Sequence, residues 1–280
     1  MFVKNKTRSL LRRAFVYVIL VFFVILVNLP SLNMAGTAFK KKTSAFTDLS
    51  LLPRRVSLEN FLNVLSNTSY GINVLNSVII AIIVTSLCTL IAALSGYAIS
   101  RFHSPALRGF SVMLLVLQIF PGILLLMPLF RILGDLKLLN TRWSVILSYT
   151  AILLPLSIWM LKIFFDTIPL EIEESAQIDG SSYFKILLRI IMPLSSPGIA
   201  VVAIFCFVNS WNEYMIASIL LRDTEIQTLS VGLQKFVQQF SADWAALMAA
   251  STIAIIPTIF FLIFAQRYII HGLTAGAVKV

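Results

Sequence analysis

Long apolar runs limit what this chain can fold into. Five of them lie at 73–99, 107–129, 143–165, 197–217 and 245–270, and they contain few charged residues. A helix of about twenty apolar residues crosses the hydrocarbon core of a bilayer and pairs its own backbone polar groups there. Only 12% of the residues are charged, about half the share of a soluble domain. We therefore predict an all-α membrane protein.

A further apolar run, 14–35, follows the basic arm 1–13. A basic arm before a short apolar core is also typical of a cleaved signal peptide, which is the alternative interpretation. Asn33 lies three residues before a cut after Ala35, where cleavage requires a small residue. We favour a retained first span, followed by an extracytoplasmic loop over 36–72.

Small residues and prolines within the runs indicate how the helices pack and bend. Pro121 and Gly122 lie in the middle of the run 107–129 and can break that helix. Pro155 and Pro257 lie inside later runs. The run 73–99 carries small residues that permit close packing between membrane helices, namely Ala81, Ser86, Ala92, Ala93, Ser95 and Gly96.

The segment 166–196 is polar but keeps a helical pattern. Pro169 can start a helix, because its missing N–H has no intrahelical partner there. Gly180 can end this helix in a left-handed conformation. Acidic residues favour the first turns through the helix dipole, and three of them fall there: Glu171, Glu173 and Glu174.

A second short helix is predicted after Gly180. Ser181 or Ser182 can cap it, and Pro193 is expected to stop it. Its apolar face follows the i, i+3, i+4, i+7 pattern through Phe184, Leu187, Leu188 and Ile191. The segment therefore reads as two helices joined by a glycine bend, between the fourth and fifth spans.

The segment resembles the EAA loop of bacterial ABC importer permeases. The family pattern is E-A-A, three residues, G, nine residues, I, one residue, L-P. This chain has Ser175 in place of the first alanine and Met192 in place of the leucine. The resemblance implies a coupling helix that docks on a cytoplasmic ATPase, and it assigns this role to Glu174, Ser175, Ala176, Asp179, Gly180, Ile190 and Pro193.

The C-terminal tail, 271–280, is similar to that of the maltose-type permeases of carbohydrate ABC importers. The similar stretches are 266–268 and 272–279. The resemblance implies that the tail reaches toward the ATPase through Gly272, Thr274 and Gly276. It also implies that 73–270 is the transmembrane domain of such an importer.

Polar residues at the end of the fifth run are candidates for the translocation pathway. Asn209, Asn212, Glu213 and Tyr214 lie there, and polar groups at membrane depth often face a pathway. The alternative is that Tyr214 belongs to the aromatic belt at the membrane interface and that the Glu213 carboxylate is simply exposed to water. Gln118, beside the Pro121 break, is a second candidate, and a kink that only aids packing is its alternative.

The resemblance implies several partners: an ABC ATPase dimer, a second and non-identical permease, and an extracytoplasmic sugar-binding protein that the loop 221–244 helps to engage. ATP and Mg²⁺ would bind to the ATPase, since this chain has no G-x-x-x-x-G-K-[ST] sequence. No metal site is expected, because Cys88 and Cys206 lie in apolar runs and the two histidines lie far apart. The net charge of +10 lies mostly between the runs, which favours lipid over nucleic acid as a partner.

Charge does not fix the orientation. The cluster 40–42 divides Lys and Arg almost evenly between the two sides of a six-span chain. The resemblance places both termini in the cytoplasm of a bacterial inner-membrane protein. A gradient-driven secondary transporter is the alternative function, but it would need ionisable residues in mid-span. A membrane enzyme would need a cluster of His, Asp or Glu.

Overall fold

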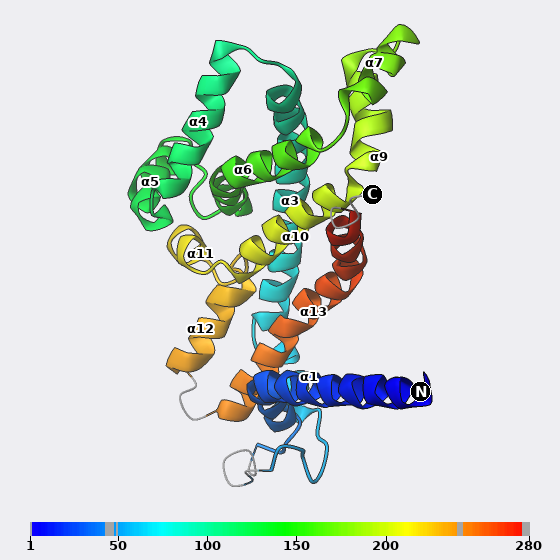
Figure 1. Ribbon diagram of the computed structural model, residues 1–280. Helices are drawn as coiled ribbons and strands as arrows, with labels where there is room; N and C mark the ends of the chain where they lie inside the picture. The colour runs from blue at the N-terminus through cyan, green and yellow to red at the C-terminus, as the bar shows by residue number, and fades with distance from the viewer. Residues whose placement is uncertain (1, 43–47, 49, 240–242, 276–280) are drawn as a thin grey trace. The chain divides into compact units, whose positions relative to one another are not determined.

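The chain folds into helices joined by connecting segments (Figure 1). The computed structural model describes residues 2–42, 48, 50–239 and 243–275, and no strand occurs within these ranges. The all-α prediction is therefore confirmed. The helices are α1 (Phe2–Ala38), α2 (Glu59–Ser66), α3 (Tyr70–Arg101), α4 (Pro105–Ile119), α5 (Leu126–Asp135), α6 (Arg142–Asp166), α7 (Leu170–Ile178), α8 (Tyr183–Ile186), α9 (Met192–Leu194), α10 (Ser196–Asn212), α11 (Met215–Leu220), α12 (Leu229–Gln239) and α13 (Trp244–Ala275), with a 3₁₀ turn at Gly122–Leu125 and a π-helical segment at Leu187–Ile191.

Four helices in the described part of the chain are long and apolar enough to cross a membrane: α1, α3, α6 and α13. Two bent pairs raise the number to six if each pair forms one span. One pair is α4 with 122–135, bent by 102°, and the other is 183–194 with α10, bent by 81°. The six-span topology stays a prediction.

Two compact units make up the chain, 69–234 with 254–280, and 1–68 with 235–253. In the larger unit α3 packs against α6 and α10 along its length. Gly96 permits this approach, because a Cβ there would lie 3.1 Å from the Ile158 carbonyl oxygen of α6. The predicted small-residue face of α3 is buried except at Ser86 and Ser95. Cys88 and Cys206 are free thiols buried in the same core, as predicted.

Of the two prolines expected to interrupt a helix, Pro121 does so and Pro193 does not. Pro121 lies two residues after the end of α4, the intervening Phe120 has an extended backbone, and the chain turns by 102° there. Pro155 and Pro257 lie inside the continuous helices α6 and α13. Pro193 does not stop its helix. It lies in the first turn of α9, where a missing N–H is tolerated, and the helix direction changes after Leu194 instead.

The predicted fifth span is interrupted near its end. α10 ends at Asn212, Glu213 is extended, and α11 begins at Met215. The sixth helix is longer than predicted, since α13 continues to Ala275. Gly272 and Thr274 therefore lie in its last turns, and Gly276 lies outside the described residues.

The smaller unit explains the lysine cluster 40–42. The Lys40 side chain is buried, and its Nζ donates to the carbonyl oxygens of Asp48 at 2.5 Å and Ser50 at 2.7 Å. Lys42 pairs with Asp243 at 2.6 Å, and this hydrogen bond raises the pKa of Lys42. Two of the three lysines therefore hold the loop after α1 in place, and the orientation of the chain stays a prediction.

Candidate functional site

The segment 169–182 folds into the predicted helix, bend and cap. Pro169 precedes α7, and Gly180 ends it with a left-handed φ of 78°. The Gly180 N–H donates to the Gln177 carbonyl at 2.9 Å, and the Ser181 N–H donates to the Ala176 carbonyl at 3.0 Å. This pair of bonds is the Schellman motif. Ser182 occupies the cap position of α8, but its side chain makes no capping bond.

A buried ion pair holds α7 to the end of α3. Arg101 Nε lies 2.6 Å from Glu173 Oε1, and the two side chains are 7% and 3% exposed. Tyr97 donates its hydroxyl to the other Glu173 oxygen, also at 2.6 Å. Arg101 Nη2 donates to the carbonyl oxygens of Phe165 and Ile168, at 3.0 and 3.2 Å. We call Tyr97, Arg101 and Glu173 the coupling anchor.

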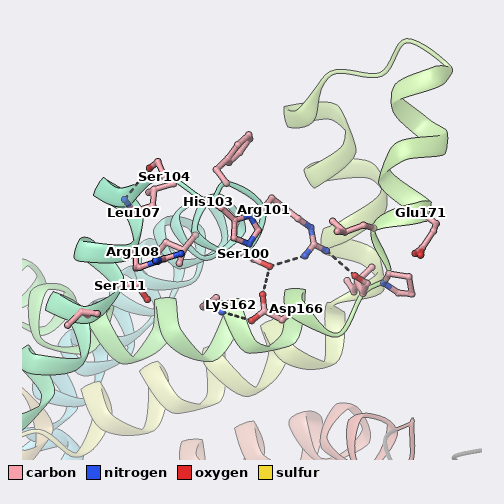
Figure 2. A pocket seen from close by; sticks show the side chains of 16 residues that line it. Ser100, Arg101, His103, Ser104, Leu107, Arg108, Ser111, Lys162, Asp166 and Glu171 are labelled. Atoms are coloured by element: carbon pink, nitrogen blue, oxygen red, sulfur yellow. Dashed lines mark hydrogen bonds and ion pairs between the residues drawn. The ribbon is translucent and has the colours of Figure 1, made fainter.

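The anchor continues into the end of α6. Arg101 Nη1 donates to Ser100 Oγ at 2.9 Å, and Ser100 donates to Asp166 Oδ1 at 2.6 Å. Lys162 pairs with the other Asp166 oxygen at 2.5 Å. Figure 2 shows this chain of polar contacts running between α3 and α6. The start of α7 is thereby fixed to two long helices through polar groups.

The other face of α7 is open. Glu174, Ser175, Asp179 and Gly180 are exposed, and the Ile178 side chain is 87% exposed. Of the remaining residues assigned by resemblance, Pro193 is exposed, Ala176 is buried, and Ile190 packs against the core. α7 therefore has one face tied inward and one face available to another molecule.

A cavity of about 710 Å³ lies beside the coupling anchor (Figure 2). It is bounded by the end of α3, the start of α4, the end of α6 and the start of α7. Its polar lining includes Ser100, Arg101, His103, Arg108, Lys162 and Asp166. Among the described residues, no group of three or more His, Cys, Asp or Glu could hold a metal ion.

The pathway candidates separate into two sets. Glu213 is partly buried, accepts from the Tyr149 hydroxyl at 2.5 Å, and accepts from the Ile216 N–H at 2.8 Å. Glu213 therefore caps α11 and ties it to α6. Neither of the two sequence interpretations, a pathway residue or a carboxylate exposed to water, predicted this role. The exposed candidates are Asn209, Asn212, Tyr214 and, at the end of α4, Gln118.

A second polar cluster lies at the opposite end of α3. The Asn73 amide donates to the carbonyls of Thr224 and Gln227 at 2.9 and 3.0 Å. The Asn76 amide donates to Glu225 and Gln227 at 2.8 and 3.0 Å. These bonds hold the loop 221–229 against α3.

Two more side chains complete this cluster. Ser77 Oγ accepts from the Leu229 N–H at 2.8 Å. Asn140 Oδ1 accepts from the N–H groups of Arg222 and Asp223 at 2.9 and 3.1 Å. We call Asn73, Asn76, Ser77 and Asn140 the loop clamp. The loop that it holds continues directly into α12, a helix that the sequence did not predict.

The partners of Glu173 were also missed. The sequence placed Glu173 only as an acid of the first turn, because Tyr97 and Arg101 lie more than seventy residues earlier. One signal was present: Glu173 lies three residues before Ala176 and so shares its face of α7. An acid on the inward face of a helix requires a buried cation or donor.

Comparison with known proteins gives a consistent result. The family described as "Binding-protein-dependent transport system inner membrane component" matches residues 88–274. The maltodextrin transport system permease protein MalD of Streptococcus pneumoniae is 33% identical over 98% of this chain and 98% of its own length. The trehalose/maltose transport system permease protein MalG of Thermococcus litoralis is 33% identical over 97% and 98%.

A solved structure has the same fold. It is a bacterial ABC transporter involved in the import of the acidic polysaccharide alginate, with a TM-score of 0.79 over 92% of this chain and 96% of that chain. The sequence identity is 21%, so this likeness concerns the fold.

Proposed function

Because the chain belongs to the family of binding-protein-dependent transport system inner membrane components, we propose that it forms half of the pathway through which an importer moves a sugar or oligosaccharide. The chain is a permease subunit of an ABC importer, and a separate subunit hydrolyses ATP. The full-length similarity to maltodextrin and trehalose/maltose permeases carries the carbohydrate assignment.

In this proposal α7 is the coupling helix. Its exposed face, with Glu174, Ile178 and Asp179, docks on the ATPase subunit, which also binds ATP and Mg²⁺. Its inward face is held by the ion pair between Glu173 and Arg101. A docked helix that is tied to α3 and α6 moves those helices when the ATPase subunits close, whereas a loose loop would absorb the motion. The two-faced arrangement of α7 supports this role.

The pathway requires a second permease, which we propose to be a different chain. Asn209, Asn212, Tyr214 and Gln118 are exposed in this subunit and would line the passage. Glu213 has a positioning role instead, because its carboxylate is occupied by Tyr149 and the N-terminus of α11.

The loop 221–229 and α12 would face the solute-binding protein on the other side of the membrane. The loop clamp supports this assignment, since it fixes the backbone of a loop whose residues 222–225 are exposed. A fixed loop loses little conformational entropy when a partner binds. This assignment places α7 and both termini in the cytoplasm, with six spans between the termini.

The test is purification of the chain from its native membrane, followed by ATP-driven uptake in vesicles. We expect an ATPase, a second permease and a solute-binding protein to copurify. Uptake of labelled maltotriose or trehalose should require ATP and be lost when the ATPase gene is deleted. Uptake that persists without ATP would replace this proposal by a gradient-driven carrier.

A further inference from the structure

The cavity beside the coupling anchor has residues that neither the anchor nor the docking face of α7 uses. Arg108 and His103 both line it, and neither side chain makes a hydrogen bond or ion pair with another described residue. Figure 2 shows Arg108, His103 and Lys162 around the same hollow, each from a different element. The cavity therefore holds hydrogen-bond donors that have no acceptor in the part of the chain that the structure describes.

The other two cations of the lining are already paired with carboxylates. Arg101 is paired with Glu173, and Lys162 is paired with Asp166. Glu171 lies at the far edge of the hollow, on the α7 side (Figure 2). Among the described lining residues, the guanidinium of Arg108 is thus the cation without an ion-pair partner, and the part of the cavity around it, away from Glu171, suits an anion.

The surroundings of the cavity are those of a membrane–water boundary. It lies at the polar ends of the apolar helices α3 and α6 and at the start of α4. α4 exposes apolar side chains at this cavity, namely the lining residue Val112 at 55% and its neighbour Met113 at 49%. Lys162 Nζ lies 5.6 Å from the ring centre of Trp159, a residue type common at this boundary.

We infer that this cavity binds the phosphate headgroup of an anionic phospholipid. A guanidinium binds phosphate oxygens through two parallel hydrogen bonds, and the exposed apolar face of α4 accommodates acyl chains. Inorganic phosphate shares the headgroup chemistry but would make no use of that face. The cavity and the coupling anchor share Arg101, so a bound headgroup also braces the start of α7. The choice of the cytoplasmic leaflet for this lipid rests on the proposed function, and the headgroup site itself does not.

The experiment measures lipid retention by the purified transporter complex. The complex is equilibrated in nanodiscs that contain equal amounts of phosphatidylglycerol and phosphatidylcholine, and retained lipid is counted by native mass spectrometry. We expect preferential retention of phosphatidylglycerol, which Arg108→Gln lowers by about tenfold, the value of one strong charge-assisted contact. Arg189→Gln, which removes an exposed arginine outside the cavity, should leave retention unchanged.

Each other result overturns the inference. Equal retention in wild type and Arg108→Gln would mean that the cavity holds no headgroup, for example because an ATPase segment fills it. An Arg108-dependent rise in melting temperature with inorganic phosphate, without phosphatidylglycerol retention, would make the cavity a phosphate site. Retention is measured without ATP or sugar, so failure of the proposed function does not alter this test.

Discussion

The coupling anchor and the loop clamp hold loops to the two ends of the same helix with different polar groups. At the C-terminal end of α3, Tyr97 and Arg101 hold α7 through one buried carboxylate. At the N-terminal end, neutral amide and hydroxyl side chains hold the backbone of 221–229. The helix between them has 32 residues, and so is roughly 48 Å long.

The anchor and the clamp differ in what the removal of one bonding group does to the remaining contacts. The anchor concentrates its bonds on Glu173, so removal of one partner leaves a buried charge unpaired. The clamp spreads its bonds over several neutral groups, so removal of one group leaves carbonyls that other donors still satisfy in part. We infer that the anchor behaves as an all-or-none link and the clamp as a graded one.

The largest effect is expected from Glu173→Leu. Arg101 would then be buried without its carboxylate, at a cost of about 3–5 kcal/mol. Thermal unfolding of the purified complex should show this loss, and ATP-driven uptake should be abolished.

Two further variants sharpen this prediction. The double variant Arg101→Met with Glu173→Leu should recover most of the stability, because both charges are gone. Glu171→Leu removes an exposed acid from the same turn and serves as the control. Equal stability of the Glu173 and Glu171 variants would contradict the all-or-none description of the anchor.

Asn76→Leu should have an intermediate effect. It removes the amide that bonds to Glu225 and Gln227 and the oxygen that accepts from Arg142, at a cost of about 1–3 kcal/mol. Hydrogen exchange of the backbone amides in 221–229 should speed up, while copurification of the ATPase stays unchanged. Asn67→Leu, at an exposed position, is the control. Unchanged exchange in the Asn76 variant would show that the clamp does not hold the loop.

Gly180→Val should have the smallest effect on stability, because Gly180 is exposed. Its φ of 78° costs an ordinary L-residue about 1–2 kcal/mol. The bend after α7 should deform, and uptake per ATP hydrolysed should fall while membrane insertion is retained. Gly180→Asn should keep most of the activity, since asparagine tolerates this conformation. Wild-type uptake by the valine variant would show that the bend is not needed for coupling.

Local rules predicted much of the fold. The helix over 143–165, the break at Pro121 and the left-handed Gly180 depend on hydropathy or on a single backbone preference. The interruption at Glu213 could not be predicted, because it depends on a partner, Tyr149, in another helix.

The site was predicted in the same uneven way. Glu174 and Asp179 are exposed on α7, where the motif predicts a partner-binding face, and docking of a partner there stays a prediction. The anchor depends on contacts between residues 97–101 and residue 173, and no local pattern carries such a pairing. Pro193 shows the opposite error, since a local rule ended a helix that the preceding π-helical segment carries forward.

The most direct test of the account is a photo-crosslinker placed on the exposed face of α7. A photoreactive residue at Ile178, which is 87% exposed, should crosslink to the ATP-binding subunit of the purified complex. The same residue at Val112, which is 55% exposed on α4, should crosslink to lipid and not to that subunit. Mass spectrometry of the products identifies the partner. Crosslinking of Ile178 to lipid alone would contradict the assignment of α7 as the coupling helix.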